Sequence, residues 1–216
     1  LLIVGGGVVG CELDFIYGDF GSQVTVVEGL DRLLPVPSID ADMSRLLLRE
    51  AKKKGIKAEL GRTVSKVSIV DGHVEAELAP SPFLPEDKIP QASRKPASIE
   101  ADCVFSTVGR VPNTAGLGLA EAGIQTDQRG WISVNDRLET SLAGVYAIGD
   151  VLGPARTMLA HMAEAEARCA VDACFGEPRT PDYQACPAAV FTSPEIACVG
   201  LTEEQAKAQG FDCACP

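Results

Sequence analysis

Three glycines near the start of the chain have the spacing of a phosphate-binding loop. The apolar run Leu1–Val4 is followed by Gly5, Gly7 and Gly10, which form a GxGxxG pattern. In such a loop the first glycine lets the chain turn sharply, the second lets backbone approach a pyrophosphate, and the third lets the next helix pack against the sheet. N–H groups at the start of that helix then face the phosphates. These residues predict a dinucleotide-binding site.

A carboxylate follows at the distance that such a site needs. A second apolar run, Val24–Val27, ends at Glu28, which comes 18 residues after Gly10. This spacing fits a βαβ unit whose acidic residue accepts hydrogen bonds from the adenosine ribose. A carboxylate accepts both ribose hydroxyls of NAD and repels the 2′-phosphate of NADP, so Glu28 favours NAD. Arg32 is the nearby cation that would weaken this preference.

Hydrophobic periodicity indicates the elements that position these residues. The expected elements of the first half are a helix from Val8 to about Phe20 that stops at Gly21, a helix capped by Ser38 or Asp40, a strand over 56–60, and a hairpin of 64–70 and 73–78 around Asp71-Gly72. Residues 80–97 are rich in proline, serine and charge, which predicts an exposed loop. Residues 98–106 return as the strand that closes a nucleotide-binding domain.

The second half has weaker patterns. The expected elements are a short helix end at 119–123, short strands over 131–134 and 144–150, a helix over 158–175, strands over 188–191 and 196–199, and a capped helix over 202–209. The fold class is therefore α/β, with a Rossmann-like domain that carries an antiparallel ribbon and further units after it.

Composition excludes some classes of partner. The net charge of −11 argues against nucleic acid and against an anionic membrane surface, and no apolar run is long enough for a membrane span. Most of the eight cysteines stand in apolar contexts, such as Cys103 and Cys198, so we expect buried, reduced thiols and a cytoplasmic location. Cys213 and Cys215 have no neighbouring ligands, and no metal site is expected.

Five motifs in order carry a resemblance to a known family. They are the glycine loop, Thr107–Thr114, Gly144–Asp150, Met158–His161 and Phe191–Gly200. This order resembles the flavoprotein disulfide reductases (the class I pyridine nucleotide-disulfide oxidoreductases), and within them the dihydrolipoyl dehydrogenases. The resemblance implies an NAD-binding domain over 1–112, the C-terminal part of an FAD-binding domain over 113–182, and the beginning of a dimerisation domain over 183–216.

The same resemblance implies that the chain is a fragment. The redox CxxxxC pair of the family would lie upstream of Leu1, and its His and Glu proton-transfer motif downstream of Pro216. The chain would then hold cofactor contacts and no catalytic residue. Cys169 and Cys174 reproduce the CxxxxC spacing, but they fall within a predicted helix and in the wrong part of the family order, so they are not expected to form the redox disulfide.

The resemblance also implies two groups of cofactor contacts. Those for NAD are Gly5, Gly6, Gly7, Val8, Val9, Gly10, Cys11, Glu12, Glu28, Val64 and Gly109. Those for FAD are Asp150, expected as a buried carboxylate on the ribityl chain, and Met158, Leu159, Ala160 and His161, at a helix N-terminus facing the isoalloxazine. Glu12 would pair with an upstream lysine, so in this chain it is expected to be exposed or protonated.

The sequence also predicts the positions of its two histidines. His73 follows the hairpin turn and should face solvent, and His161 should pack beside the flavin rather than act with Glu164 as a base.

The full-length protein that the resemblance implies is a homodimer. It would oxidise the lipoyl domain of a 2-oxo acid dehydrogenase or glycine cleavage complex. Alternatives are a mercuric reductase, a glutathione-type reductase, a transhydrogenase, or a module that senses NAD without chemistry.

Overall fold

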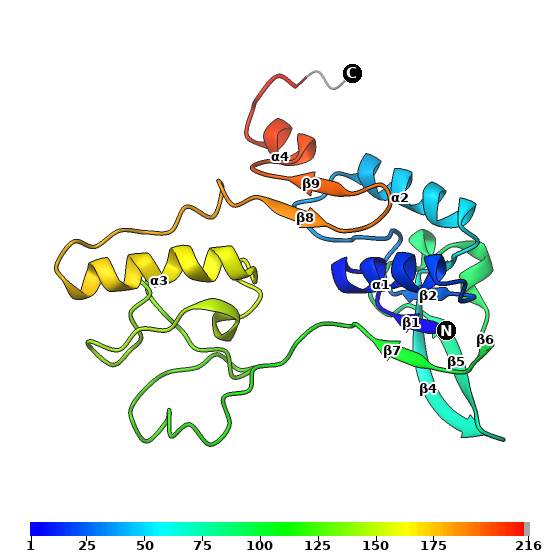
Figure 1. The fold of residues 1–216 in the computed structure, drawn as a ribbon, viewed down its shortest axis with the longest axis horizontal. Coiled ribbons are helices and arrows are strands. Elements are labelled where there is room, and N and C mark those ends of the chain that lie inside the picture. Colours follow the sequence, from blue (N-terminus) through cyan, green and yellow to red (C-terminus); the bar gives the residue numbers. More distant parts are fainter. Residues whose placement is uncertain (214–216) are drawn as a thin grey trace. The chain divides into compact units, whose positions relative to one another are not determined.

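The structure, a computed structural model, describes residues 1–213 and divides into two compact units (Figure 1). The first unit comprises Leu1–Gly109 together with the chain from Ala189 onwards, and the second comprises Arg110–Ala188. The first unit contains both sheets of more than two strands, and the second contains the longest helix.

A four-stranded parallel sheet forms the centre of the first unit. Its strands are β1 (Leu2–Val4), β2 (Thr25–Glu28), β3 (Lys57–Leu60) and β7 (Val104–Ser106), in the order β3-β2-β1-β7. Helix α1 (Val8–Asp19) connects β1 to β2, and α2 (Ala41–Lys53) connects β2 to β3. Strand–helix–strand order with parallel pairing confirms the expected α/β class.

A second sheet in this unit is antiparallel. It consists of β4 (Arg62–Val70), β5 (His73–Pro80) and β6 (Ala97–Ala101). Asp71 and Gly72 both have positive φ, as the tight turn of the expected hairpin requires. The single strand expected over 98–106 was wrong, because the run divides into β6 and β7, which pair in different sheets. Cys103 lies in the break and is exposed rather than buried.

The loop between β5 and β6 is anchored rather than wholly exposed. It contains the short 3-10 helices η1 (Glu86–Lys88) and η2 (Gln91–Arg94). The buried guanidinium of Arg62 donates to the carbonyls of Ala92 and Lys95 at 2.6 and 2.7 Å. Ser93 donates its hydroxyl to the carbonyl of Leu60 at 2.7 Å. Composition could not show these contacts, because they join residues that are 30 to 33 positions apart in sequence.

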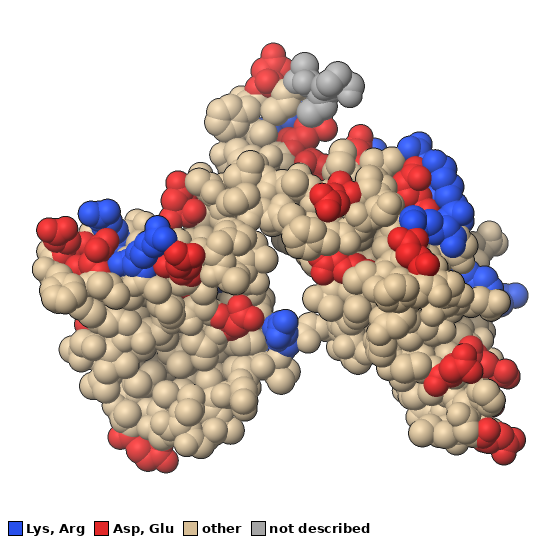
Figure 2. Space-filling view, viewed as in Figure 1, with Lys and Arg blue, Asp and Glu red and all other residues tan. Residues whose placement is uncertain are grey.

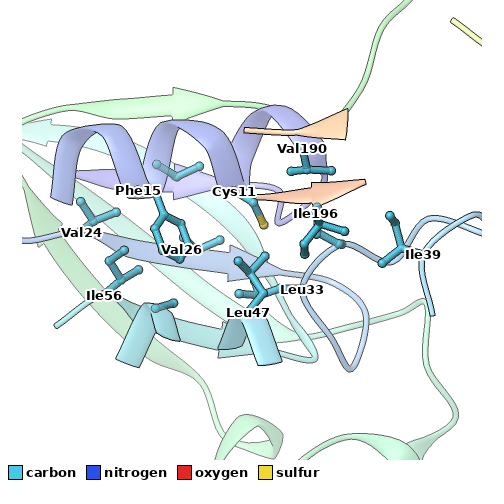
Figure 3. Close-up of a cluster of buried hydrophobic side chains, with 13 residues drawn as sticks. Cys11, Phe15, Val24, Val26, Leu33, Ile39, Leu47, Ile56, Val190 and Ile196 are labelled. Atoms are coloured by element: carbon cyan, nitrogen blue, oxygen red, sulfur yellow. The ribbon is translucent and has the colours of Figure 1, made fainter. Parts of the chain in front are cut away.

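The main core joins the start of the chain to its last third (Figure 3). The hairpin of β8 (Ala188–Val190) and β9 (Ile196–Cys198) places Val190 and Ile196 in the cluster that contains Cys11, Leu33 and Leu47. Helix α4 (Glu203–Ala208) follows, and Thr202 and Gln205 form the capping box that its sequence predicts. Asp40 accepts the Glu203 N–H at 2.9 Å, which ties α4 to the start of α2.

The second unit is mostly irregular. Its regular elements among the described residues are η3 (Gly149–Leu152) and α3 (Ala160–Cys174). The helix end expected at 119–123 is a series of turns, and the expected strands over 131–134 and 144–150 are reduced to bridges of Thr126 with Ile132 and of Glu139 with Tyr146. A strand needs a continuous row of backbone partners, and these segments pair at single residues only.

Charged side chains of the first unit gather over α2 (Figure 2). Lys53 pairs with Glu50 at 2.9 Å, and Lys54 pairs with Asp19. The lysines near the C-terminal end of α2 therefore form a solvated face, and their positive charge complements the negative end of the helix dipole. No helix within residues 1–213 is long and apolar enough to cross a membrane.

Candidate functional site

The glycine loop between β1 and α1 has the geometry that its spacing predicts. Gly5 has a φ of +108°, and a Cβ at position 10 would lie only 1.9 Å from the Gly5 carbonyl oxygen. A Cβ at position 7 would meet no atom within 4 Å. Gly5 therefore makes the turn, Gly10 allows α1 to pack closely on it, and Gly7 presents bare backbone to open space.

The first turn of α1 lies directly beside this open space. Gly7 is the N-cap residue, and no side chain caps the helix. The first N–H groups of an α-helix have no partner within the helix, and they carry the positive end of its dipole. Val8 is half-buried and Val9 is exposed in this turn. The turn can hold an anion such as a pyrophosphate.

Glu28 is tied to the same loop. Its side chain is almost completely buried, with Oε2 accepting the Gly6 N–H at 2.6 Å and Oε1 accepting the Leu30 N–H at 2.7 Å. Each carboxylate oxygen retains a further lone pair for an outside donor. Within the part of the chain that the structure describes, Arg32 forms no ion pair with Glu28. The carboxylate is therefore fixed in place and available to ribose hydroxyls.

Thr107 is a site residue that sequence reasoning missed. Its hydroxyl lies 2.9 Å from the carbonyl of Val4 and 2.8 Å from that of Gly5. It follows β7 and holds the glycine turn from the neighbouring strand. A threonine after an apolar strand carries no sequence signal for this contact.

Gly109 and Val64 are two further residues that the sequence analysis assigns to NAD. Gly109 has a φ of +118°. Val64 lies at a register shift between β4 and β5.

The two residues at the far end of the GxGxxGCE motif have protein partners. Glu12 accepts the backbone N–H of Phe191 at 3.0 Å and is half-buried. The expectation of an exposed or protonated Glu12 did not foresee this donor, which lies 179 residues away in sequence. Cys11 is fully buried and donates its thiol to the Gly6 carbonyl. Burial and the nearby Asp14 raise the pKa of the Cys11 thiol far above its usual range.

Asp14 is a second residue that the sequence did not single out. It is completely buried on α1, and neither carboxylate oxygen has a hydrogen-bond partner among the described residues. Burial raises its pKa to about 8. A buried carboxylic acid without an ion-pair partner is stable mainly in its neutral form.

Two of the expected flavin contacts of the second unit meet at one cleft. Asp150, at η3, and Met158 line a space of about 480 Å³ together with Arg110 and Trp131. Asp150 was expected to be buried, but 53% of its side chain is exposed, and Arg110 Nε lies 4.0 Å from its Oδ2. The carboxylate therefore faces the cleft with a cation beside it.

The other expected flavin contacts lie at the start of α3. Leu159 is the N-cap residue without a side-chain cap, Ala160 begins the helix, and Met158 precedes it. His161 is exposed and its Nε2 lies 2.8 Å from the carbonyl oxygen of Pro187. Glu164 pairs with Arg168 instead of orienting His161, so the two do not form a base and its carboxylate.

Glu166 supports the turn that presents Asp150, and sequence reasoning also missed it. Its buried carboxylate accepts the Gly149 N–H at 2.6 Å and the Tyr183 hydroxyl at 2.8 Å. Burial and the Glu166 contact raise the pKa of Tyr183 to about 12, so this hydroxyl stays a donor. Glu166 therefore fixes the backbone immediately before Asp150.

A larger cleft of about 1090 Å³ contains none of the predicted contacts. It is lined by residues at the amino ends of the parallel strands, among them Leu1, Thr25 and Lys57. Ligands of open parallel sheets bind beyond the carboxyl ends of the strands, where Gly5 and Glu28 stand. The glycine loop and Glu28, at the carboxyl ends, are therefore the candidate dinucleotide site.

The cysteines of residues 1–213 form no disulfide. Cys169 and Cys174 both lie in α3, where the sequence predicts a helix, and both thiols are free. Cys213 is free, and Cys215 lies outside the described residues. No group of three or more potential metal ligands occurs within that range. His73 is largely exposed and lies 3.4 Å from Asp102, which confirms its expected position at the surface.

Comparison with known proteins gives two family matches. The family described as pyridine nucleotide-disulphide oxidoreductase matches residues 1–167. The family described as pyridine nucleotide-disulphide oxidoreductase, dimerisation domain, matches residues 186–215.

Individual relatives agree with these matches. The chain is 39% identical to the leghemoglobin reductase of Glycine max and 41% identical to a dihydrolipoyl dehydrogenase of Thermus scotoductus, each over 98% of this chain. It covers 38% and 43% of those proteins, so it spans about two-fifths of their length. The HOCl-induced flavoprotein disulfide reductase RclA of Escherichia coli has a similar structure, with a TM-score of 0.81 and 30% identity over 98% of this chain and 44% of that one.

Proposed function

The chain belongs to the pyridine nucleotide-disulphide oxidoreductase family, and on this premise we propose that it forms the NAD-binding part and a share of the FAD-binding part of a flavoenzyme. The proposed divisions are 1–112 for NAD, 113–182 for FAD, and 183–216 for the beginning of the dimerisation domain. When bound, these cofactors supply hydride and electron transfer between a dithiol and nicotinamide. The pairing of a bare glycine loop with a fixed carboxylate is the observation that carries this proposal.

The NAD site would use the carboxyl end of the parallel sheet. Gly7 and the first turn of α1 offer backbone N–H groups to the pyrophosphate, and the absence of a Cβ at position 7 leaves room for it. Glu28 would accept the adenosine ribose hydroxyls with the lone pairs that Gly6 and Leu30 leave available. Val8, Glu12 and Gly109 would border the nicotinamide, and Val64 would border the adenine.

The FAD contacts would come from the second unit. Asp150 would accept hydrogen bonds from the ribityl hydroxyls at the 480 Å³ cleft, with Glu166 fixing the preceding turn. The N-terminal end of α3, from Met158 to His161, would place its positive dipole near the isoalloxazine. The exposed carboxylate of Asp150 fits the hydroxyl donors of a ribityl chain. The uncapped N-terminal end of α3 fits an isoalloxazine edge that carries partial negative charge.

We assign the whole reaction to the full-length protein, because the chain spans only part of its relatives. The proposed reaction is oxidation of a dihydrolipoyl group by NAD, and relatives named dihydrolipoyl dehydrogenase support it. The proposed partners are a second copy of the protein and the lipoyl domain of a 2-oxo acid dehydrogenase or glycine cleavage complex. The proposed location is the cytoplasm.

The test uses the full-length protein, purified with its native cofactor. We expect a bound flavin spectrum and NAD-dependent oxidation of dihydrolipoamide at a rate far above that with reduced glutathione. Absence of flavin would overturn the enzyme assignment in favour of an NAD-sensing module. Faster turnover with a glutathione-type or mercuric substrate would keep the family and overturn the lipoyl assignment.

A further inference from the structure

An aromatic ring from the long β5–β6 loop lies directly over the residue that follows Glu28. A Cβ at position 29 would stand 2.9 Å from Cδ2 and 3.3 Å from Cε2 of Phe83. Glycine at position 29 therefore lets the Phe83 ring approach the backbone beyond the end of β2. The loop thus brings an aromatic ring to Gly29, the residue that directly follows the carboxylate that would hold the ribose.

The backbone of Phe83 is held by hydrogen bonds although its ring is exposed. The Phe83 N–H donates to the hydroxyl of the buried Ser81 at 3.1 Å, and the Ser81 N–H donates to the Gly61 carbonyl at 2.9 Å. The Gly61 N–H in turn donates to the Leu30 carbonyl at 2.9 Å. This chain of bonds ties Phe83 to the segment just after Glu28, while 68% of the residue remains exposed.

We propose that Phe83 is a stacking face for the adenine ring of the bound dinucleotide. The inference rests on the proposed NAD site. If the pyrophosphate lies at Gly7 and the ribose at Glu28, the base extends from the ribose away from the phosphates, toward Gly29. Phe83 covers Gly29 there. An exposed aromatic ring stacks on any base, since every base has a π-face.

The proposal gives the long loop a function in cofactor affinity. Arg62 and Ser93 hold the loop against β3 and β4 through partly buried hydrogen bonds, which limits the conformational entropy that the loop loses when a base binds. A ring fixed before binding contributes more to affinity than one that must be ordered by the ligand. Phe83 is therefore an affinity residue rather than a reacting one.

The first experiment is calorimetric titration of the 216-residue chain with NADH and with ADP-ribose. Phe83→Ala should weaken both ligands by about fivefold to tenfold, the lower part of the range for base–aromatic stacking. Phe83→Trp should retain wild-type affinity, and Phe83→Leu should resemble Phe83→Ala, because leucine restores volume without a π-face. The melting temperatures of all three variants should match the wild type, since the ring is exposed.

Phe20→Ala is the matched control. Phe20 is also an exposed aromatic residue, but it caps the C-terminal end of α1, at the opposite end of that helix from Gly7. Its replacement should leave both affinities unchanged. An equal loss in Phe20→Ala and Phe83→Ala would overturn the proposal, because the effect would then not depend on the position of the ring.

The second experiment detects the contact itself. In the NADH complex, nuclear Overhauser effects should join the Phe83 ring protons to adenine H2 or H8. Wild-type affinity in Phe83→Ala, or ring contacts to nicotinamide protons only, would overturn the stacking proposal and leave the NAD site intact. Failure of the wild-type chain to bind NADH or ADP-ribose would overturn the NAD site and the stacking face together.

Discussion

The Oε2 atom of Glu28 lies 2.6 Å from the backbone nitrogen of Gly6, which donates its hydrogen to the carboxylate. The residue that would choose the nucleotide therefore also fixes the loop that would hold its phosphates. The proposed contacts to the ribose and to the pyrophosphate are therefore linked through this hydrogen bond, and a change at Glu28 should affect both.

Glu28→Gln should weaken NADH binding by about tenfold or more, because hydrogen bonds to a charged acceptor are roughly twice as strong as neutral ones. The same change should narrow the preference for NADH over NADPH, since the repulsion of the 2′-phosphate is removed. Calorimetric titration with both nucleotides measures this, and Glu75→Gln on the exposed face of β5 is the control. Tighter binding of NADPH than of NADH by the wild-type chain would contradict the assignment of Glu28.

Gly7→Ala and Gly10→Ala should separate binding from folding. A Cβ at position 10 would lie 1.9 Å from the Gly5 carbonyl oxygen, so Gly10→Ala should destabilise the unit severely, by about 2 kcal/mol or more. A Cβ at position 7 meets no protein atom, so Gly7→Ala should keep the wild-type melting temperature and lose NADH affinity. Thermal unfolding and NADH titration measure the two effects. A stable Gly10→Ala chain would show that α1 packs differently from this structure.

Glu166→Gln should destabilise the second unit by about 1–3 kcal/mol, because the Gly149 N–H and the Tyr183 hydroxyl share one charged, buried acceptor. Tyr183→Phe removes one of these bonds and should cost less. Urea unfolding monitored in the second unit measures both changes. The control is Glu164→Gln, an exposed partner of Arg168, which should cost under about 0.5 kcal/mol. Equal effects of the Glu164 and Glu166 changes would contradict the role of Glu166.

Asp14 should make the first unit less stable as pH rises. Its pKa of about 8 in the folded chain exceeds that of an unfolded aspartate, about 3.9. Between about pH 4 and pH 8, Asp14 is therefore protonated in the folded state and ionised in the unfolded state. The stabilising contribution is complete below about pH 4 and is lost as the pH rises to about 8, by up to about 1.4 kcal/mol per pH unit.

Asp14→Ala should remove this dependence and stabilise the chain above about pH 7. Urea unfolding at pH 5, 7 and 9 measures the slope in the wild type and the variant. Asp31→Ala, a change at an exposed aspartate, should leave the wild-type slope unchanged. The same slope in Asp14→Ala and the wild type would contradict the buried, unpartnered position of Asp14.

The sequence alone predicts the structural features that depend on local patterns. The glycine loop, Glu28 at the end of β2, the Asp71-Gly72 hairpin and the Thr202 cap all follow from spacing or turn chemistry, and the structure confirms them. Each of these features needs only residues that are close together in the chain.

The features that the sequence did not predict depend on distant partners. Phe191 as a donor to Glu12 and Arg62 as the anchor of the β5–β6 loop cannot be inferred from neighbouring residues. Cys103 was expected to be buried because its neighbours are apolar, but it falls between strands of two different sheets. Asp150 was expected to be buried at a strand end, but its segment forms a 3-10 helix beside an open cleft.

Amide chemical-shift mapping of the ¹⁵N-labelled 216-residue chain with NADH tests the central claim most directly. We expect the largest shifts at Gly5–Glu12, Glu28 and Leu30, which surround the carboxyl ends of β1 and β2. Amides of the larger cleft, such as Thr25 and Lys57, should move little. Shifts confined to that larger cleft, or no shifts at millimolar NADH, would contradict the assignment of the glycine loop as a dinucleotide site.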